Sequence, residues 1–324
     1  MFRDGRYLPK STSRIRLMTS FQRTCLVAAL VVVSALPAGA QESGLSFLRI
    51  GTDAAAIALG DAHVAHSRDA FATYWNPAGL AAGTENTTAL SHHVWVGDVR
   101  TYAFASRFRA GAKGGLGLFV TATGSGDLEA REGPGDPAGF FDAQFVSTGA
   151  AYGRAFGPVR LGVTAKYLSE RIFSQSASGY AFDFGVQADV LKGGLQLGAA
   201  LQNVGEMNEL NAASTKLPRT LRVGAAVYPF NILAEDGADL FNLMVVAEVS
   251  HNFAGDRTQV HVGLAGEAFE MLQIRVGYLS NDALRDISFG AGLRFSNLHF
   301  DYALLPFSSG FGGAGHVLTL AYGW

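Results

Sequence analysis

The chain has 324 residues, with 25 basic and 27 acidic side chains and a formal net charge of −2. Because basic residues are not in excess, the composition argues against nucleic acid as a partner. Hydrophobic residues make up 48% of the chain and charged residues only 16%, while glycine occurs 40 times. Alternating strands that present one apolar face to lipid account for such a composition.

Residues 1–40 have the features of a secretory signal peptide. Basic residues precede an apolar run at 25–37, which closes with the cleavage pattern Ala38-Gly39-Ala40. The run is about 13 residues long, whereas a helix that crosses a bilayer needs about 20. Cleavage near Ala40 removes Cys25, the single cysteine, so we expect no disulfide and no cysteine-ligated metal. The leader holds six basic residues and one acidic residue, so the exported chain has 19 basic and 26 acidic residues.

Residues 41–84 are rich in alanine and glycine, and we expect them to form a plug packed inside a lumen. Asp53 and Asp69 each precede a short helical pattern that an aspartate can cap, and residues 60–65 between them are expected to be extended. The segment closes with the motif Trp75, Asn76, Pro77 and Gly79. In it the proline restricts the preceding residue to extended backbone, and the glycine permits a tight reversal.

Residues 85–324 contain segments of about ten residues with alternating polarity, which predict an all-β, antiparallel transmembrane β-barrel of fourteen strands. Alternation alone does not say which face is wet, so a soluble barrel or sandwich is the competing interpretation. The expected strands are 85–96, 99–109, 113–123, 142–155, 158–172, 178–190, 194–204, 218–229, 241–253, 258–267, 270–279, 285–295, 297–305 and 314–324.

The face opposite the apolar one is rich in glycine and charge, as expected of a polar lumen. On 158–167, for example, Val159, Leu161 and Val163 alternate with polar or small residues. Such charges either tune what passes through the lumen or pair with one another across the wall. The candidate lumen-lining residues are Arg160, Lys166, Asp183, Arg222 and Asp301. Interfacial aromatic belts are expected to contain Trp95, Tyr102, Tyr167, Tyr278 and Trp324.

The connection lengths predict the orientation of the barrel. With both chain ends in the periplasm, connections after even strands should be short and those after odd strands longer. The pattern holds except at 230–240, which is either a miscounted strand or a periplasmic protrusion. Among the outer connections, 124–141 with Phe140 and Phe141 is the first candidate for contact with another protein.

The chain ends on an aromatic residue within an alternating strand. Leu320, Tyr322 and Trp324 share one face of that strand. This ending resembles the C-terminal signal by which bacterial outer-membrane barrels are inserted. The resemblance implies the bacterial outer membrane as location, with its lipid and the barrel-assembly machinery as partners.

The sequence gives no sign of catalysis. Ser91, His92, His93 and Asp98 could suggest a Ser/His/Asp set, but neighbouring strand residues point to opposite faces, so at most one histidine faces a given site. No His/Asp/Glu spacing resembles a zinc or calcium site. We therefore expect no catalytic residue, no bound metal, no cofactor and no enzymatic activity.

Residues 47–61 and 69–81 resemble the N-terminal signature of the PorV/PorQ family, relatives of the FadL-type transporters that share its Asn-Pro-Ala element, here Asn76 to Ala78. Residues 289–295 and 299–303 are similar to that family's closing strands. The resemblance implies a fourteen-stranded barrel with a lumenal plug. One departure is that many relatives have a second glycine where this chain has Asp61.

Two functions follow from this resemblance. The first is a component of type IX-like secretion, which docks exported cargo or a surface protease at the cell surface. The alternative is a FadL-like channel that takes up fatty acids or other hydrophobic small molecules.

Overall fold

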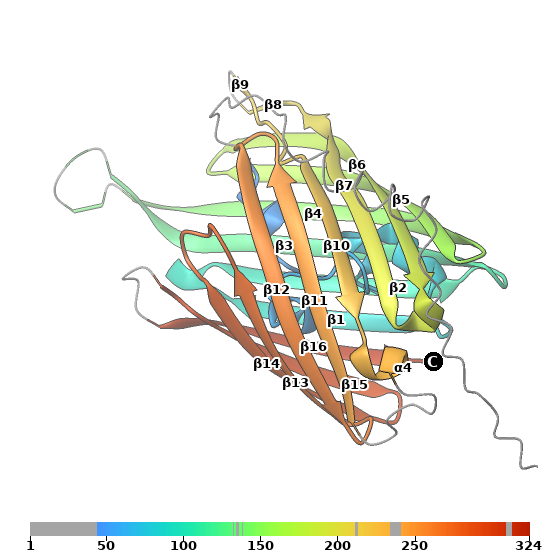
Figure 1. Cartoon of the computed structure of the whole chain (residues 1–324). Coiled ribbons are helices and arrows are strands. Elements are labelled where there is room, and N and C mark those ends of the chain that lie inside the picture. Colours follow the sequence, from blue (N-terminus) through green and yellow to red (C-terminus); the bar gives the residue numbers. More distant parts are fainter. Residues whose placement is uncertain are drawn as a thin grey trace, which may run out of the picture. The chain divides into compact units, whose positions relative to one another are not determined.

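Fourteen antiparallel strands of the described chain close into a barrel (Figure 1). The computed structural model describes residues 44–131, 133, 136–137, 139–210, 213–233, 241–308 and 313–324, so the expected signal peptide lies outside the described residues. The strands follow the order β1-β16-β15-β14-β13-β12-β11-β10-β7-β6-β5-β4-β3-β2, and β1 pairs with both β2 and β16. The expected barrel of fourteen strands is confirmed.

The strands have the following bounds: β1 Thr87–Val94, β2 Arg100–Arg109, β3 Gly114–Ala130, β4 Gly139–Phe156, β5 Val159–Ile172, β6 Gln175–Val190, β7 Leu195–Met207, β10 Thr220–Val227, β11 Phe241–Asn252, β12 Arg257–Ala268, β13 Leu272–Leu279, β14 Ile287–Phe295, β15 Leu298–Pro306 and β16 Ala314–Gly323. A separate two-stranded sheet pairs β8 (Glu209–Leu210) with β9 (Ala213–Ser214). No helix among the described residues is long and apolar enough to cross a membrane.

The outer face of the barrel is apolar and the inner face is polar. On β5, Val159, Leu161 and Val163 are exposed, whereas Arg160 and Lys166 between and beyond them are buried. A closed barrel that exposes an apolar face has no unpaired sheet edge and can satisfy every backbone group in lipid. The protein is therefore an outer-membrane β-barrel, and a soluble sandwich, with its apolar face inside, does not describe it.

The two ends of the barrel differ in their connections. At the end where β1 begins and β16 finishes, five of the six connections have two to four residues, whereas at the other end five of the seven have five or more. Short turns lie in the periplasm and longer loops outside the cell, so we call this the periplasmic end. The described part of the segment 230–240 lies at this end. Its first part belongs to helix α4 (Pro229–Leu233), and 234–240 lies outside the described residues.

The connection expected at 124–141 is mostly strand. β3 continues to Ala130 and β4 begins at Gly139, with a register shift between Ser125 and Leu128. The two strands therefore form a hairpin that extends beyond their barrel neighbours, because β2 pairs with β3 only as far as Gly124.

Short helical turns form the plug: η1 (Ser46–Arg49), α2 (Ala54–Ile57), α3 (Ala72–Trp75) and η2 (Pro77–Ala81). Asp53 caps α2 as expected, since its carboxylate accepts the Ala56 N–H at 2.9 Å. Asp69 instead accepts the Phe71 N–H at 2.8 Å, and α3 begins only at Ala72. Two further short turns, η3 (Val96–Asp98) and η4 (Leu191–Gly193), lie in connections between strands.

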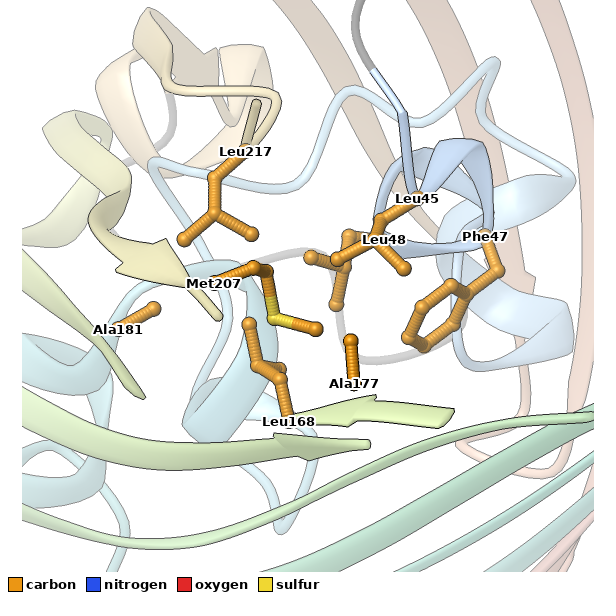
Figure 2. Packing of buried hydrophobic residues seen from close by; sticks show 8 residues of the cluster. All are labelled: Leu45, Phe47, Leu48, Leu168, Ala177, Ala181, Met207 and Leu217. Carbon is orange, nitrogen blue, oxygen red and sulfur yellow. The ribbon is translucent and has the colours of Figure 1, made fainter. Parts of the chain in front are cut away.

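An apolar cluster fixes the start of the plug near the extracellular end (Figure 2). It joins η1 to inward-facing residues of three strands and to the β7–β10 connection. Its members are Leu45, Phe47, Leu48, Leu168, Ala177, Ala181, Met207 and Leu217. At the periplasmic end, buried Arg107 of β2 donates hydrogen bonds to the carbonyl groups of Leu80, Gly83 and Glu85. The plug therefore runs the length of the lumen and is held at both ends.

Between these ends, the plug backbone lies directly on inward-facing glycines of the wall. A Cβ added at Gly162 would lie 2.2 Å from the Pro77 carbonyl carbon, and one added at Gly277 would lie 2.0 Å from the Gly60 nitrogen. We call these positions the glycine seats; they are Gly115, Gly153, Gly162, Gly198, Gly263 and Gly277. At Gly185 and Gly290 the nearest plug atoms belong to the side chains of Asn76 and Ala58. Any side chain there would displace the plug.

Candidate functional site: two cavities and the turn between them

A cavity of about 240 Å³ lies on the extracellular side of the plug. The lining of this outer cavity includes apolar side chains, among them Phe47, Ile50 and Leu279. The remainder carries charge, with four arginines and two aspartates: Arg49, Arg222, Arg257, Arg285, Asp61 and Asp282. A molecule with an apolar body and a polar head matches this mixed lining.

A second cavity, of about 280 Å³, lies on the periplasmic side. It is lined by plug residues that include Leu59, His63 and His66, and by wall residues that include Tyr228 and Met244. Both cavities border β11, β12 and β13, so they lie along the same wall of the barrel. Only a short piece of plug separates them.

That piece is the partition turn, residues 59–64. Leu59 and His63 line the inner cavity and Asp61 lines the outer one. Gly60 and Asp61 have φ values of 69° and 64°. The segment expected to be extended is therefore a tight reversal, and that expectation was wrong.

Four side chains of the wall hold the partition turn through its backbone, and one of them, Gln187 of β6, donates to the Val64 carbonyl at 3.0 Å. Arg222 donates to the Asp61 carbonyl at 2.7 Å, and Nδ1 of His261 donates to the Gly60 carbonyl at 2.7 Å. Glu248 accepts the Val64 N–H at 2.9 Å. Glu248 also forms a buried ion pair with Arg222, which fixes both side chains. The partition is therefore closed by groups of β6, β10, β11 and β12.

The Asn76 motif anchors the opposite side of the plug. The Asn76 side-chain amide donates to the Val64 carbonyl at 2.8 Å and to the Val186 carbonyl at 3.0 Å. Its oxygen accepts the Ala78 N–H at 3.2 Å. Trp75 is fully buried and donates to Asp53 at 2.7 Å, while a Cβ on Gly79 would lie 1.9 Å from the Ser67 carbonyl oxygen.

The candidate lumen-lining charges all face inward, and each has an ionic partner. The pairs are Arg160–Asp189 at 2.5 Å, Lys166–Asp183 at 2.6 Å, Arg275–Asp301 at 2.6 Å, and Arg222–Glu248. Arg68 of the plug joins the first pair, 2.7 Å from Asp189. Of the two explanations that the sequence left open, pairing across the wall describes their geometry.

Trp95 does not belong to the aromatic belt in which the sequence placed it. Its ring lines the outer cavity, 5.8 Å from the Phe307 ring and 5.6 Å from the Arg285 guanidinium. Tyr102, Tyr167, Tyr278 and Trp324 do face outward and are exposed, as are Leu320 and Tyr322 of the C-terminal strand.

The possible catalytic set is not assembled. Ser91 and His93 both face inward, with Ser91 Oγ 3.1 Å from His93 Nε2. Asp98 lies in η3 and is exposed, and His92 stacks on Tyr102. Among the described residues, no group of three or more His, Cys, Asp or Glu side chains is arranged to hold a metal ion.

Sequence reasoning missed Glu248, His261 and the unpaired plug histidines. Glu248 and His261 sit in alternating strands like any other polar residue, so nothing in the sequence marks their contact with the plug. His63 and His66 are three residues apart, and their rings lie 4.2 Å apart. Neither ring nitrogen of His63 has a hydrogen-bond partner among the described residues.

Because Asp53 is buried, the binding of the plug to the barrel wall depends on pH. Burial, and then the nearby charge of Asp69, raise the pKa of Asp53 to about 7. A docked plug therefore binds this proton more readily than an undocked one, so docking weakens as the pH rises from about 4 through 7. We expect docking to weaken between pH 5 and pH 8 in wild type, and Asp53→Asn to remove this pH dependence.

Hydrogen–deuterium exchange at residues 54–58, compared between the two proteins at each pH, measures this effect. Burial lowers the pKa values of His63 and His66, so acidification weakens docking of the plug through these two groups. Both proteins contain them, so their effect cancels in the comparison. A difference at pH 5 equal to that at pH 8 would contradict the assignment.

Comparison with solved structures shows which known barrels share this architecture. The toluene transporter TbuX of Ralstonia pickettii has a TM-score of 0.59 at 14% identity, over 84% of this chain and 98% of that chain. The toluene transporter TodX of P. putida has a TM-score of 0.58 at 10% identity, over 85% and 99%. A Pseudomonas aeruginosa FadL homologue has a TM-score of 0.52 at 11% identity, over 89% and 99%.

The sequence matches no protein-family model, and its comparison with curated proteins gives no match. At these identities the structural similarities show the fold alone. The chain has the fold of the FadL-like outer-membrane barrels.

Proposed function

We propose that the chain is a channel for hydrophobic small molecules, fatty acids among them, across the outer membrane. One observation carries the proposal: two cavities lie along the same wall, and a single turn of six residues separates them. The fold supports it, since similar structures include two toluene transporters and a FadL homologue.

Passage requires movement of the partition turn rather than release of the whole plug. The two ends of the plug are fixed by the η1 cluster and by Arg107, and the Asn76 motif holds its far side. The partition turn, in contrast, is held mainly by four polar side chains of the wall, Arg222, His261, Glu248 and Gln187. If the partition turn gave up these contacts, the two cavities would connect while the rest of the plug stays bound to the wall.

Filling the outer cavity tests the proposal. Gln259 lines this cavity from β12, and its neighbour Thr258 is exposed on the opposite face of the strand. In proteoliposomes, wild-type protein should take up toluene and octanoate but exclude glucose. We expect Gln259→Trp to reduce uptake by about tenfold, an effect equivalent to roughly 1.4 kcal/mol, and Thr258→Trp to leave it unchanged. Equal uptake by both variants would refute the route.

Docking of exported proteins, as in PorV-like secretion, is the second proposal. The supporting observation is the extended β3–β4 hairpin, where Phe140 is 63% exposed. Affinity purification from outer membranes in mild detergent separates the two roles. A stoichiometric protein partner lost on removal of residues 126–138 would support docking, whereas a bound apolar molecule without a protein partner would support the channel.

A further inference from the structure

Asp61 is an aspartate in a backbone position that suits glycine. Its φ of 64° lies in the left-handed region, which only glycine enters without strain and which asparagine and aspartate tolerate. The Asp61 side chain reaches the outer cavity, where it forms a buried ion pair with Arg285. The second carboxylate oxygen of Asp61 has no hydrogen-bond partner among the described residues.

The outer cavity holds more guanidinium groups than its acids satisfy. Arg222 is paired with Glu248. The other three arginines of the lining, Arg49, Arg257 and Arg285, have only two acids beside them in the described part of the chain, Asp61 and Asp282. Nε of Arg49 and Nη1 of Arg285 are buried without a hydrogen-bond partner among the described residues. Burial, and then the like charge of Arg257, lower the pKa of Arg49. These groups are arranged to accept an anion beside the apolar surface of Phe47 and Ile50.

We propose that Asp61 is an internal counter-ion that occupies the place of a ligand's anionic head at Arg285. This inference rests on the channel proposed above, and it adds the event that starts the movement of the partition turn. When a carboxylate ligand enters the outer cavity, it takes Arg285 from Asp61. The partition turn then loses its side-chain contact with the β13–β14 connection and keeps only its backbone contacts.

The position of Arg285 explains why this exchange would reach other parts of the extracellular end. Arg285 lies over the Trp95 ring at 5.6 Å, and Trp95 contacts Phe307 at 5.8 Å. The β1–β2 and β13–β14 connections therefore meet at one guanidinium, whose partner in the plug is Asp61, and the β15–β16 connection joins them through the Trp95 ring. A ligand that binds Arg285 competes with the plug for the group on which these connections converge.

The test compares binding of octanoate and of uncharged n-octanol by the purified full-length protein in non-ionic detergent, using calorimetry. Removing the internal competitor in Asp61→Asn should tighten octanoate binding by about tenfold, and Asp61→Gly, which suits the backbone, should do the same. Binding of n-octanol should not change. Asp286→Asn, an exposed aspartate of the same connection, is the matched control and should behave as wild type.

Hydrogen–deuterium exchange at residues 59–64 gives a second readout. Octanoate should raise exchange there in wild type, and Asp61→Asn should show raised exchange without ligand. Equal octanoate affinity in wild type and both variants, or a gain for n-octanol as large as for octanoate, would overturn the counter-ion role. Absence of octanoate binding in all proteins would overturn it too, and toluene uptake would then show separately whether the channel itself stands.

Discussion

Replacing Arg222 by methionine should open the partition between the two cavities. The change removes the hydrogen bond to the Asp61 carbonyl and the contact of the guanidinium with the Trp75 ring, 4.9 Å away. It also leaves Glu248 buried without its ionic partner. Removing one partner of a buried pair costs about 3–5 kcal/mol, which we expect to appear as weaker docking of the partition turn.

Single-channel conductance in planar bilayers measures the result, and Arg222→Met should conduct where wild type is closed. The double variant Arg222→Met/Glu248→Gln removes both charges but keeps an acceptor for the Val64 N–H. It should recover much of the closed state, because no unpaired charge remains buried. If the single and double variants are equally open, the hydrogen bond to Asp61 rather than the ion pair closes the partition. A single variant as closed as wild type would contradict the whole arrangement.

The barrel could be predicted because one physical rule applies to every strand. Lipid accepts only apolar side chains, so residues such as Leu161 on β5 and Leu320 on β16 must alternate with those that face the lumen. This rule predicted the number of strands and the face of each strand on which the charged residues lie. It said little about 124–141, because β3 and β4 leave the barrel there and no longer face lipid on one side.

The plug was predicted as a segment but not in its details. Its composition indicates close packing, and Pro77 indicates the conformation of Asn76. The reversal at Gly60 and Asp61 could not be predicted from local sequence, since the contacts that hold it come from Arg222, Glu248 and His261, at least 150 residues away. Local pattern carries no information about such partners.

Trp95 shows a related error. A tryptophan just after a barrel strand usually lies in the interfacial belt, and only the nearness of Arg285 and Phe307 indicates that this ring turns into the cavity. The sequence shows that the polar face is rich in glycine, but it does not show why the glycines stand at their particular positions. The glycine seats fall where the plug backbone crosses β3, β4, β5, β7, β12 and β13, and the sequence of a single strand does not reveal such a crossing.

Gly162→Val should therefore displace the plug while the barrel still forms. Any Cβ at this seat would lie 2.2 Å from the Pro77 carbonyl carbon and 2.3 Å from the Ala78 nitrogen. Backbone atoms cannot move aside as a flexible side chain would, so the Asn76 motif must leave the wall. Overpacking of this kind costs about 1–3 kcal/mol or more, and a loss of about 3 kcal/mol changes the ratio of docked to undocked plug by about a hundredfold.

Limited proteolysis within residues 65–83, together with conductance, measures this displacement. Gly124→Val is the matched control, because the nearest atom to an added Cβ there is 3.5 Å away on Ala143. The control should be as resistant and as closed as wild type, whereas Gly162→Val should be cleaved and open. Displacement at this seat also releases the bond from Asn76 to the Val64 carbonyl, so it should open the partition from the side opposite Arg222. If Gly162→Val is cleaved but stays closed, the wall contacts of Arg222, Glu248 and His261 close the partition without help from the seats.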